Sequence, residues 1–193
     1  MALILASASA IRTAMLAAAG VPHAVVPAIV DERAASANLA EPEEVALELA
    51  RLKAREVGAR HPDALVIGSD SVVAVDGRRF DKPGSREEAA EHLRSFAGKP
   101  MRLVSAVALA RGGTIEWSHC ETATLHVRPL SEAFIAAYLD AEWPAVGHCV
   151  GVFRMEGPGV QLFESIDGDH FTILGMPLLP LLGALRERGA IPG

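Results

Sequence analysis

The sequence predicts a domain of the α/β class, in which strands and helices alternate along the chain. The length of 193 residues fits one domain, or two lobes that share one sheet. Half of the residues are hydrophobic and 5% are aromatic, so the core should consist mainly of Ala, Val, Leu and Ile. Continuous apolar runs that are typical of buried strands alternate with capped, amphipathic helical segments. These observations together favour the α/β class.

Charge and cysteine content disfavour several classes of protein. The net charge is −6 and the acids and bases are interspersed, which disfavours a nucleic-acid-binding surface. Cys120 and Cys149 form no C-x-x-C motif and are too few for a disulfide framework, so we expect reduced thiols in a cytoplasmic protein. The apolar N-terminal run breaks at Ser7, which is too early for a signal sequence or a membrane span. No membrane partner is therefore expected.

The N-terminal segment predicts a strand, a serine-rich turn and a helix. Residues 2–6 form an apolar run, and Ser9 is a good N-cap for a helix over residues 10–19. Free N–H groups at the helix start, the hydroxyls of Ser7 and Ser9, and Arg12 in the first turn would make an anion site. The alternative is simple capping by Ser9, with Arg12 on a solvated face.

Two acids and one lysine follow in the next part of the chain. Residues 21–29 read as an extended segment, and Asp31 and Glu32 come directly after it. Glu32 is either part of a loop or helix cap, or a carboxylate that binds a metal or positions water. Residues 42–60 predict a long helix with Lys53 at the border of its buried face, where a lysine usually extends to solvent.

The next stretch predicts a buried hairpin that carries a carboxylate. Residues 64–67 are continuously apolar, and Asp70 follows where this strand is expected to end. A second strand over residues 72–75 leads to an Asp-Gly turn at positions 76–77, and Lys82 lies beyond it. Asp70 is therefore a candidate for a catalytic acid held rigidly at a strand end, and the alternative is a structural hairpin with a solvated tip.

The second half of the chain continues the alternation of elements. A Gly-rich bend at residues 149–159 carries one acid, Glu156. The other elements expected there are a helix from a Ser85 cap to Gly98, strands at 103–110 and 115–127, a helix at 132–140, a strand at 160–166 and a helix at 178–188.

The candidate site residues combine cations, hydroxyls and acids. Cations and backbone N–H groups neutralise phosphate oxygens, and carboxylates hold a divalent cation or activate water. The sequence contains no Walker A, H-E-x-x-H, G-x-S-x-G or zinc-binding pattern. A triphosphate site with a divalent metal is the chemistry that suits this set of residues: Ser7, Ser9, Arg12, Glu32, Lys53, Asp70, Lys82 and Glu156.

Several motifs, in order along nearly the whole chain, resemble the Maf family of nucleoside triphosphate pyrophosphatases. Residues 5–12 (LASASAIR) resemble the family opening L-A-S-x-S-P-R-R, although its proline and first arginine are replaced. The other matching segments are Asp31-Glu32, residues 49–54 (LARLKA), residues 67–72 (IGSDSV), Gly77 with Lys82-Pro83, residues 164–168 (ESIDG) and residues 174–178 (LGMPL).

The late bend points to one branch of that family. Residues 155–157 read Met-Glu-Gly, whereas branches that cleave dTTP and UTP usually carry I-Q-G. The run at residues 149–157 instead resembles the branch that hydrolyses 7-methyl-GTP. A carboxylate at Glu156 suits this base, because it can accept hydrogen bonds from guanine N–H groups and offset the positive charge of the methylated ring.

The resemblance implies a fold, a reaction and a set of roles. The fold would be one domain over residues 1–193, with an extended mixed central sheet flanked by helices and a cleft between two lobes. The reaction would be hydrolysis of the α–β phosphoanhydride of a nucleoside triphosphate, which gives a monophosphate and pyrophosphate. The implied roles are general base for Asp70, Mg²⁺ or Mn²⁺ ligands for Glu32 and Asp70, triphosphate contacts for Arg12, Lys53, Lys82, Ser7 and Ser9, and base recognition for Glu156 and Ser71.

Two other functions remain open at this stage. The first is a pyrophosphatase for dTTP, UTP or another modified nucleotide. The second is a nucleotide-binding regulator of cell division or septum formation that acts through partners. The apolar excess is compatible with a homodimer but identifies no interface.

Overall fold

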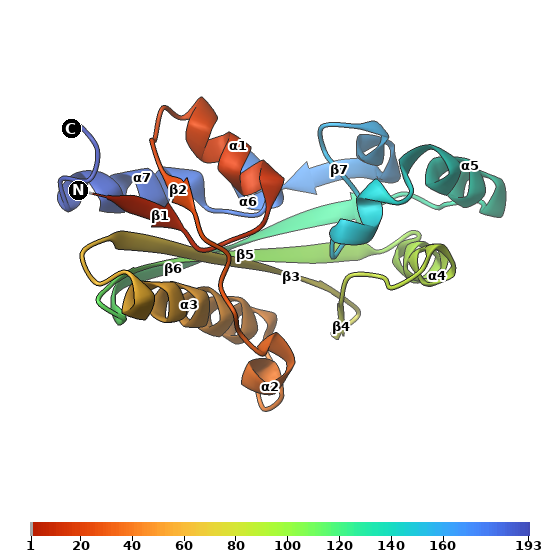
Figure 1. Cartoon of the computed structure of the whole chain (residues 1–193). Helices are drawn as coiled ribbons and strands as arrows, with labels where there is room; N and C mark the ends of the chain where they lie inside the picture. The colour runs from red at the N-terminus through yellow and green to blue at the C-terminus, as the bar shows by residue number, and fades with distance from the viewer. Residues whose placement is uncertain (1) are drawn as a thin grey trace. The chain divides into compact units, whose positions relative to one another are not determined.

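Strands and helices alternate along the chain in the computed structural model, which describes residues 2–193 (Figure 1). The strands are β1 (Leu3–Leu5), β2 (Ala24–Val25), β3 (Leu65–Val75), β4 (Arg78–Phe80), β5 (Pro100–Arg111), β6 (Thr114–Val127) and β7 (Phe163–Asp167). The α-helices are α1 (Ala10–Ala18), α2 (Glu32–Ser36), α3 (Pro42–Arg60), α4 (Arg86–Phe96), α5 (Glu132–Glu142), α6 (His170–Ile173) and α7 (Leu178–Glu187). Two 3₁₀ helices, η1 (Ala145–His148) and η2 (Pro158–Leu162), lie between α5 and β7.

The strands form one mixed sheet. Its order is β2-β1-β3-β5-β6-β7, and β4 pairs with β3 outside this path. Strand β1 runs parallel to β2 and β3, whereas β4 is antiparallel to β3 and β7 is antiparallel to β6. The predicted α/β class with a mixed sheet and flanking helices is therefore confirmed.

The chain divides into two compact units. Unit 1 contains residues 1–71, 104–121 and 169–193, and unit 2 contains residues 72–103 and 122–168. Three of the four boundaries fall within the long strands β3, β5 and β6, and the fourth lies between β7 and α6. No helix formed by residues 2–193 combines the length and the apolar character that are needed to cross a bilayer.

Helices cover the strands of unit 1 on both faces. Leu5 and Ile67 belong to a buried cluster that includes residues of α1 and α7. Their sequence neighbours Ile4 and Val66 point to the opposite face and pack with Val57 of α3. Figure 1 shows α1 and α7 on one side of β1 and α3 on the other. Burial on both faces explains why these strands are continuously apolar rather than alternating.

Local signals set the helix starts as the sequence predicted. Ser9, Ser85 and Ser131 are the N-caps of α1, α4 and α5, and each side chain accepts a hydrogen bond from a backbone N–H three residues later. The predicted hairpin is also present, with Val75 paired to Arg78 and both turn residues at positive φ.

Three boundaries differ from expectation. Asp70 does not end a strand, because β3 continues through it from Leu65 to Val75. The strand expected over 160–166 is shifted, because η2 occupies Pro158–Leu162 and β7 begins at Phe163. The segment 21–29 contributes only Ala24–Val25 to the sheet, with prolines at positions 22 and 27 on either side.

Candidate functional site

Lys53 of α3 lies between two carboxylates in unit 1. Its Nζ is 2.6 Å from Asp70 Oδ1 on β3 and 2.8 Å from Glu32 Oε1 at the start of α2. The side chains of Lys53 and Asp70 are only 12% and 11% exposed, whereas Glu32 is 52% exposed. Lys53 therefore does not extend to solvent, and it forms a largely buried ion pair with Asp70 that Glu32 closes from the outside.

Gly68 explains why α3 lies close enough to β3 for this contact. A Cβ atom at position 68 would lie 2.1 Å from the carbonyl oxygen of Ala50 and 2.6 Å from the backbone nitrogen of Ala54. Only glycine allows the strand and the helix backbone to approach so closely. The Gly-Ser-Asp segment, which suggests a strand end in the sequence, is thus a point of close helix–strand packing that places Lys53 beside Asp70.

Burial sets the protonation behaviour of Asp70. It raises the pKa of Asp70 above its ordinary value, and the positive charges of Lys53 and Arg12 oppose this shift. A carboxylate whose pKa moves toward neutrality is better suited to accept a proton from water than one on an exposed surface.

Arg12 is buried and almost fully hydrogen-bonded. Its Nε donates to Gly175 O at 2.9 Å, Nη1 donates to Ser69 O at 3.0 Å and to Ser7 Oγ at 3.3 Å, and Nη2 donates to Ser71 Oγ at 3.0 Å. A guanidinium has five N–H groups, so one N–H of Nη2 remains after these four bonds. Burial lowers the pKa of Arg12, and the charges of Asp70 and Glu32 oppose that effect.

The N-terminal turn therefore does more than cap a helix. Ser9 caps α1 as the simpler alternative required, but Arg12 is 9% exposed and does not lie on a solvated face. Ser7 Oγ accepts hydrogen bonds from the Ser9 backbone N–H at 3.2 Å and from Arg12. The turn is thereby tied to the strand that carries Asp70.

A buried hydroxyl network surrounds Arg12, and most of its members were not predicted from the sequence. The Gly175 carbonyl accepts hydrogen bonds from Ser69 Oγ at 3.2 Å and Ser71 Oγ at 3.1 Å in addition to the one from Arg12. Ser71 Oγ also lies 2.9 Å from Ser105 Oγ. Gly175 has φ +104°, and a Cβ there would lie 3.3 Å from Ser71 Oγ, so this position favours glycine.

The network extends through α6. Ser105 Oγ donates to Thr172 O at 2.8 Å, and Thr172 Oγ1 donates to Glu121 Oε2 at 2.6 Å. Ser105 is fully buried among the apolar residues of β5. A lone hydroxyl in an apolar strand is the one signal that could have indicated this network from the sequence, because a buried hydroxyl needs a partner.

Lys82 and Glu156 lie in unit 2, and both are exposed. Burial raises the pKa of the Cys149 thiol, Glu156 raises it further, and Arg154 and Lys82 lower it. The charges of Lys82 and Glu156 therefore both influence Cys149, in opposite directions. The other predicted residues, Ser7, Ser9, Arg12, Glu32, Lys53, Asp70 and Ser71, belong to unit 1.

The two carboxylates around Lys53 could hold a divalent cation. Glu32 Oε1 and Asp70 Oδ1 both contact the Lys53 ammonium, so oxygens of the two carboxylates can approach a single cation. Residues 2–193 contain no group of three or more His, Cys, Asp or Glu that could hold a metal. This donor set fits Mg²⁺, which proteins commonly bind through one or two carboxylates while phosphate and water oxygens complete its shell.

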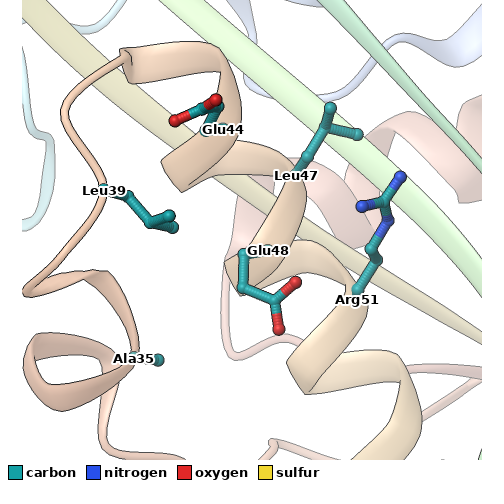
Figure 2. Close-up of a pocket in the computed structure, with 6 residues that line it drawn as sticks. All are labelled: Ala35, Leu39, Glu44, Leu47, Glu48 and Arg51. Carbon is teal, nitrogen blue, oxygen red and sulfur yellow. The ribbon is translucent and has the colours of Figure 1, made fainter.

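A pocket of about 350 Å³ is lined by residues of α2, α3 and the segment that joins them. Figure 2 shows its six lining residues, and none of them is a predicted site residue. Its cation, Arg51, is hydrogen-bonded to Ser118 Oγ at 2.9 Å. Its lining contains two acids, Glu44 and Glu48, beside this one cation, which is a poor match for the negative charge of a triphosphate.

Comparison with known proteins agrees with the motifs. The sequence profile described as "Maf-like protein" matches residues 2–188. A 7-methyl-GTP pyrophosphatase of Rhizobium etli is 48% identical over 195 residues, which cover 99% of this chain and 98% of that protein. A nucleoside triphosphate pyrophosphatase of Granulibacter bethesdensis is 48% identical over 198 residues, with 99% of each chain covered.

A solved structure gives a much weaker match. The Ham1 protein of Staphylococcus aureus aligns with 66% of this chain and 72% of its own, with a TM-score of 0.44 and 16% identity, which is too low to assign function. The sequence profile and the full-length relatives decide the family, and they confirm the resemblance found in the sequence: the chain belongs to the Maf-like family.

Proposed function

We propose that this protein is a nucleoside triphosphate pyrophosphatase that hydrolyses 7-methyl-GTP to 7-methyl-GMP and pyrophosphate. The observation that carries the proposal is the buried Lys53–Asp70 pair with Glu32 beside it. It combines a proton acceptor, a cation and a candidate metal ligand, which are the groups that phosphoanhydride hydrolysis needs. The names of the two relatives, both 48% identical, support the reaction class.

Asp70 acts as the general base. A water oxygen attacks the α-phosphorus while Asp70 accepts its proton. The bond between the α-phosphorus and the bridging oxygen breaks, and pyrophosphate leaves with the electron pair. The raised pKa of Asp70 favours the proton transfer, and its pairing with Lys53 holds the carboxylate in one orientation.

The cations and helix-start groups neutralise the triphosphate. Lys53 and Lys82 contact phosphate oxygens, and Arg12 contributes its remaining Nη2 N–H together with its charge. Ser7 and the α1 N-terminus at Ser9 add neutral donors. Because four of its five N–H groups are engaged within the protein, Arg12 contributes more to holding the surrounding residues in place than to direct contact with the triphosphate.

Glu32 and Asp70 would hold Mg²⁺ or Mn²⁺ when the nucleotide binds. The metal would neutralise charge on the phosphate oxygens near the attacked phosphorus. Glu32 is half-exposed and can reorient, so it can leave Lys53 for the metal without exposing a buried charge. Asp70 keeps Lys53 as its partner in that state.

Base recognition falls to the bend that carries Glu156. Its exposed carboxylate can accept hydrogen bonds from guanine N1–H and the exocyclic amine, and it offsets the charge of the 7-methylated ring. Ser71 is the other candidate, although its hydroxyl is engaged by Arg12, Ser105 and Gly175.

A substrate panel tests the proposal. Initial rates are measured with 7-methyl-GTP, GTP, dTTP, UTP, CTP and ITP in the presence of Mg²⁺ or Mn²⁺, and pyrophosphate and monophosphate are quantified together. We expect the highest kcat/KM with 7-methyl-GTP. The substitution Glu156→Gln should lower the ratio of kcat/KM for 7-methyl-GTP to that for GTP. A preference for dTTP or UTP would instead assign the protein to the other pyrophosphatase branch, and release of single phosphates would refute the reaction itself.

A further inference from the structure

Helix α5 holds the bend that carries Glu156 at two points in unit 2. Tyr138 and Glu142 are four residues apart and therefore lie on one face of α5. The Tyr138 hydroxyl donates to the carbonyl of Val152 at 2.9 Å, and Glu142 pairs with Arg154. The bend is thus fixed two and four residues before Glu156.

The Glu142–Arg154 pair is well formed and partly buried. Arg154 Nε and Nη2 lie 3.0 Å and 2.9 Å from the same oxygen, Glu142 Oε2. Glu142 is 6% exposed and Arg154 is 36% exposed. A Cβ at Gly157 would lie 3.6 Å from both Arg154 Nη2 and Glu142 Oε2, so the chain passes directly over the pair.

The backbone after Arg154 folds back tightly. A Cβ at Gly159 would lie 2.5 Å from the carbonyl oxygen of Arg154, which only glycine avoids. The Gly157 N–H also donates to that carbonyl at 3.3 Å. Glu156 therefore sits on a short loop whose two ends are both anchored at Arg154.

Glu156 remains free on this loop. Its carboxylate is exposed and makes no hydrogen bond or ion pair with any of residues 2–193, although it acts electrostatically on Arg154. Arg154 is only two positions away, but it directs Nε and Nη2 to Glu142 and forms no ion pair with Glu156. The charge of Glu156 is therefore felt by Arg154 but is not held in a direct contact with it.

We infer that Glu142 is a positioning residue for base selectivity, which holds Arg154 away from Glu156 so that the Glu156 carboxylate faces a cationic purine. The inference rests on the proposed function, because it explains how that site selects a methylated base. Glu142 and Arg154 cancel one another, and the bend presents the single negative charge of Glu156. A positively charged ring gains from this charge, and an unmethylated guanine gains less.

The test compares Glu142→Gln with the double variant Glu142→Gln/Arg154→Gln. Glutamine at 142 releases the guanidinium to Glu156, so the ratio of kcat/KM for 7-methyl-GTP over GTP should fall about fivefold, chiefly through KM. The double variant removes the released guanidinium and should restore the ratio. General damage to the bend would lower kcat with both substrates or lower the thermal unfolding temperature, so both quantities are measured for each variant.

Each outcome decides a specific point. Equal loss of the ratio in the single and double variants would show that Glu142 only anchors the bend, and an unchanged ratio in Glu142→Gln would show that it has no part in selectivity. Either result overturns the inference and leaves the proposed function intact, provided that the wild type prefers 7-methyl-GTP. A wild type without that preference overturns both.

Discussion

The candidate residues of unit 1 and those of unit 2 differ in burial and in how their charges are paired. In unit 1, Lys53, Asp70 and Arg12 are largely buried, and each has charged or hydrogen-bonded partners within the protein. In unit 2, Glu156 and Lys82 are exposed, and the bend that carries Glu156 is held by Tyr138 and Glu142 of α5. The first arrangement fixes geometry, and the second presents charge.

This difference suits unit 1 to catalysis of the hydrolysis and the bend of unit 2 to selection of the nucleotide base. A general base must hold its orientation and have a perturbed pKa, which requires burial and fixed partners. A group that selects a base must exchange its water for a ligand, which an already paired carboxylate does poorly. We therefore expect substitutions in unit 1 to change turnover and stability, and those at the bend to change preference.

The largest expected effect tests the chemical role of unit 1. Asp70→Asn removes the proton acceptor but keeps the size and polarity of the side chain, so kcat should fall about 10³-fold while nucleotide binding is largely kept. Steady-state rates and equilibrium binding of the nucleotide measure the two quantities. Asp63→Asn, the same change at an exposed position, is the control and should be neutral. Near wild-type turnover in Asp70→Asn would refute its role.

The packing of β3 against α3 should dominate stability. Gly68→Ala forces a methyl group into the backbone of α3, 2.1 Å from the Ala50 carbonyl oxygen, so we expect a loss of about 3 kcal/mol in the free energy of unfolding. Denaturant titration measures it. Gly183→Ala in α7 meets nothing within 4 Å and should instead stabilise by about 0.5–1 kcal/mol. Equal effects of the two changes would contradict the close approach.

Local features of unit 1 were predictable, and its long-range contacts were not. Ser9 could be identified as an N-cap because a cap depends on three neighbouring residues. The bond from Arg12 to Gly175 spans 163 residues, and no local pattern encodes it. Asp70 was expected at a strand end because glycine and serine precede it, but Gly68 serves a helix contact that only the tertiary structure reveals.

At the bend of unit 2 too, the sequence indicated a candidate residue but not the long-range contacts that hold it. Glu156 attracted notice because it is the one acid in a Gly-rich segment. Its positioning by Glu142 was missed, because a buried glutamate at the end of a helix looks like a solvated one in sequence. The family motifs point to candidate site residues, whereas the side chains that contact and orient these candidates are visible only in the structure.

A smaller effect is expected at the half-exposed carboxylate of unit 1. Glu32→Gln leaves the Lys53–Asp70 pair in place but weakens the proposed metal site, so the Mg²⁺ concentration for half-maximal rate should rise about tenfold with little change in saturated kcat. Rates across a Mg²⁺ titration measure this shift. Glu41→Gln, at an exposed acid before α3, is the control. An unchanged Mg²⁺ requirement would remove Glu32 from the metal site.

The smallest effects compare the two thiols. Burial raises the pKa of Cys120 to about 11, so at pH 8 only about one molecule in a thousand carries the thiolate, and alkylation by iodoacetamide should be slow. The acids Glu43 and Glu121 contribute to this raised pKa of Cys120, whereas Lys82 and Arg154 lower the pKa of Cys149, which should therefore react faster.

Removing the charge of Glu156 or of Lys82 should change the alkylation rate of Cys149 in opposite directions and leave that of Cys120 unchanged. Glu156→Gln removes a charge that raises the pKa of Cys149, so its alkylation should become about twofold faster, and Lys82→Gln removes a charge that lowers it, so alkylation should become about twofold slower. Mass spectrometry of both cysteines over time measures this, with Cys120 as the internal reference. Because this readout needs no substrate, opposite shifts would place Lys82 and Glu156 on one surface even if the proposed substrate were wrong, and parallel shifts would separate them.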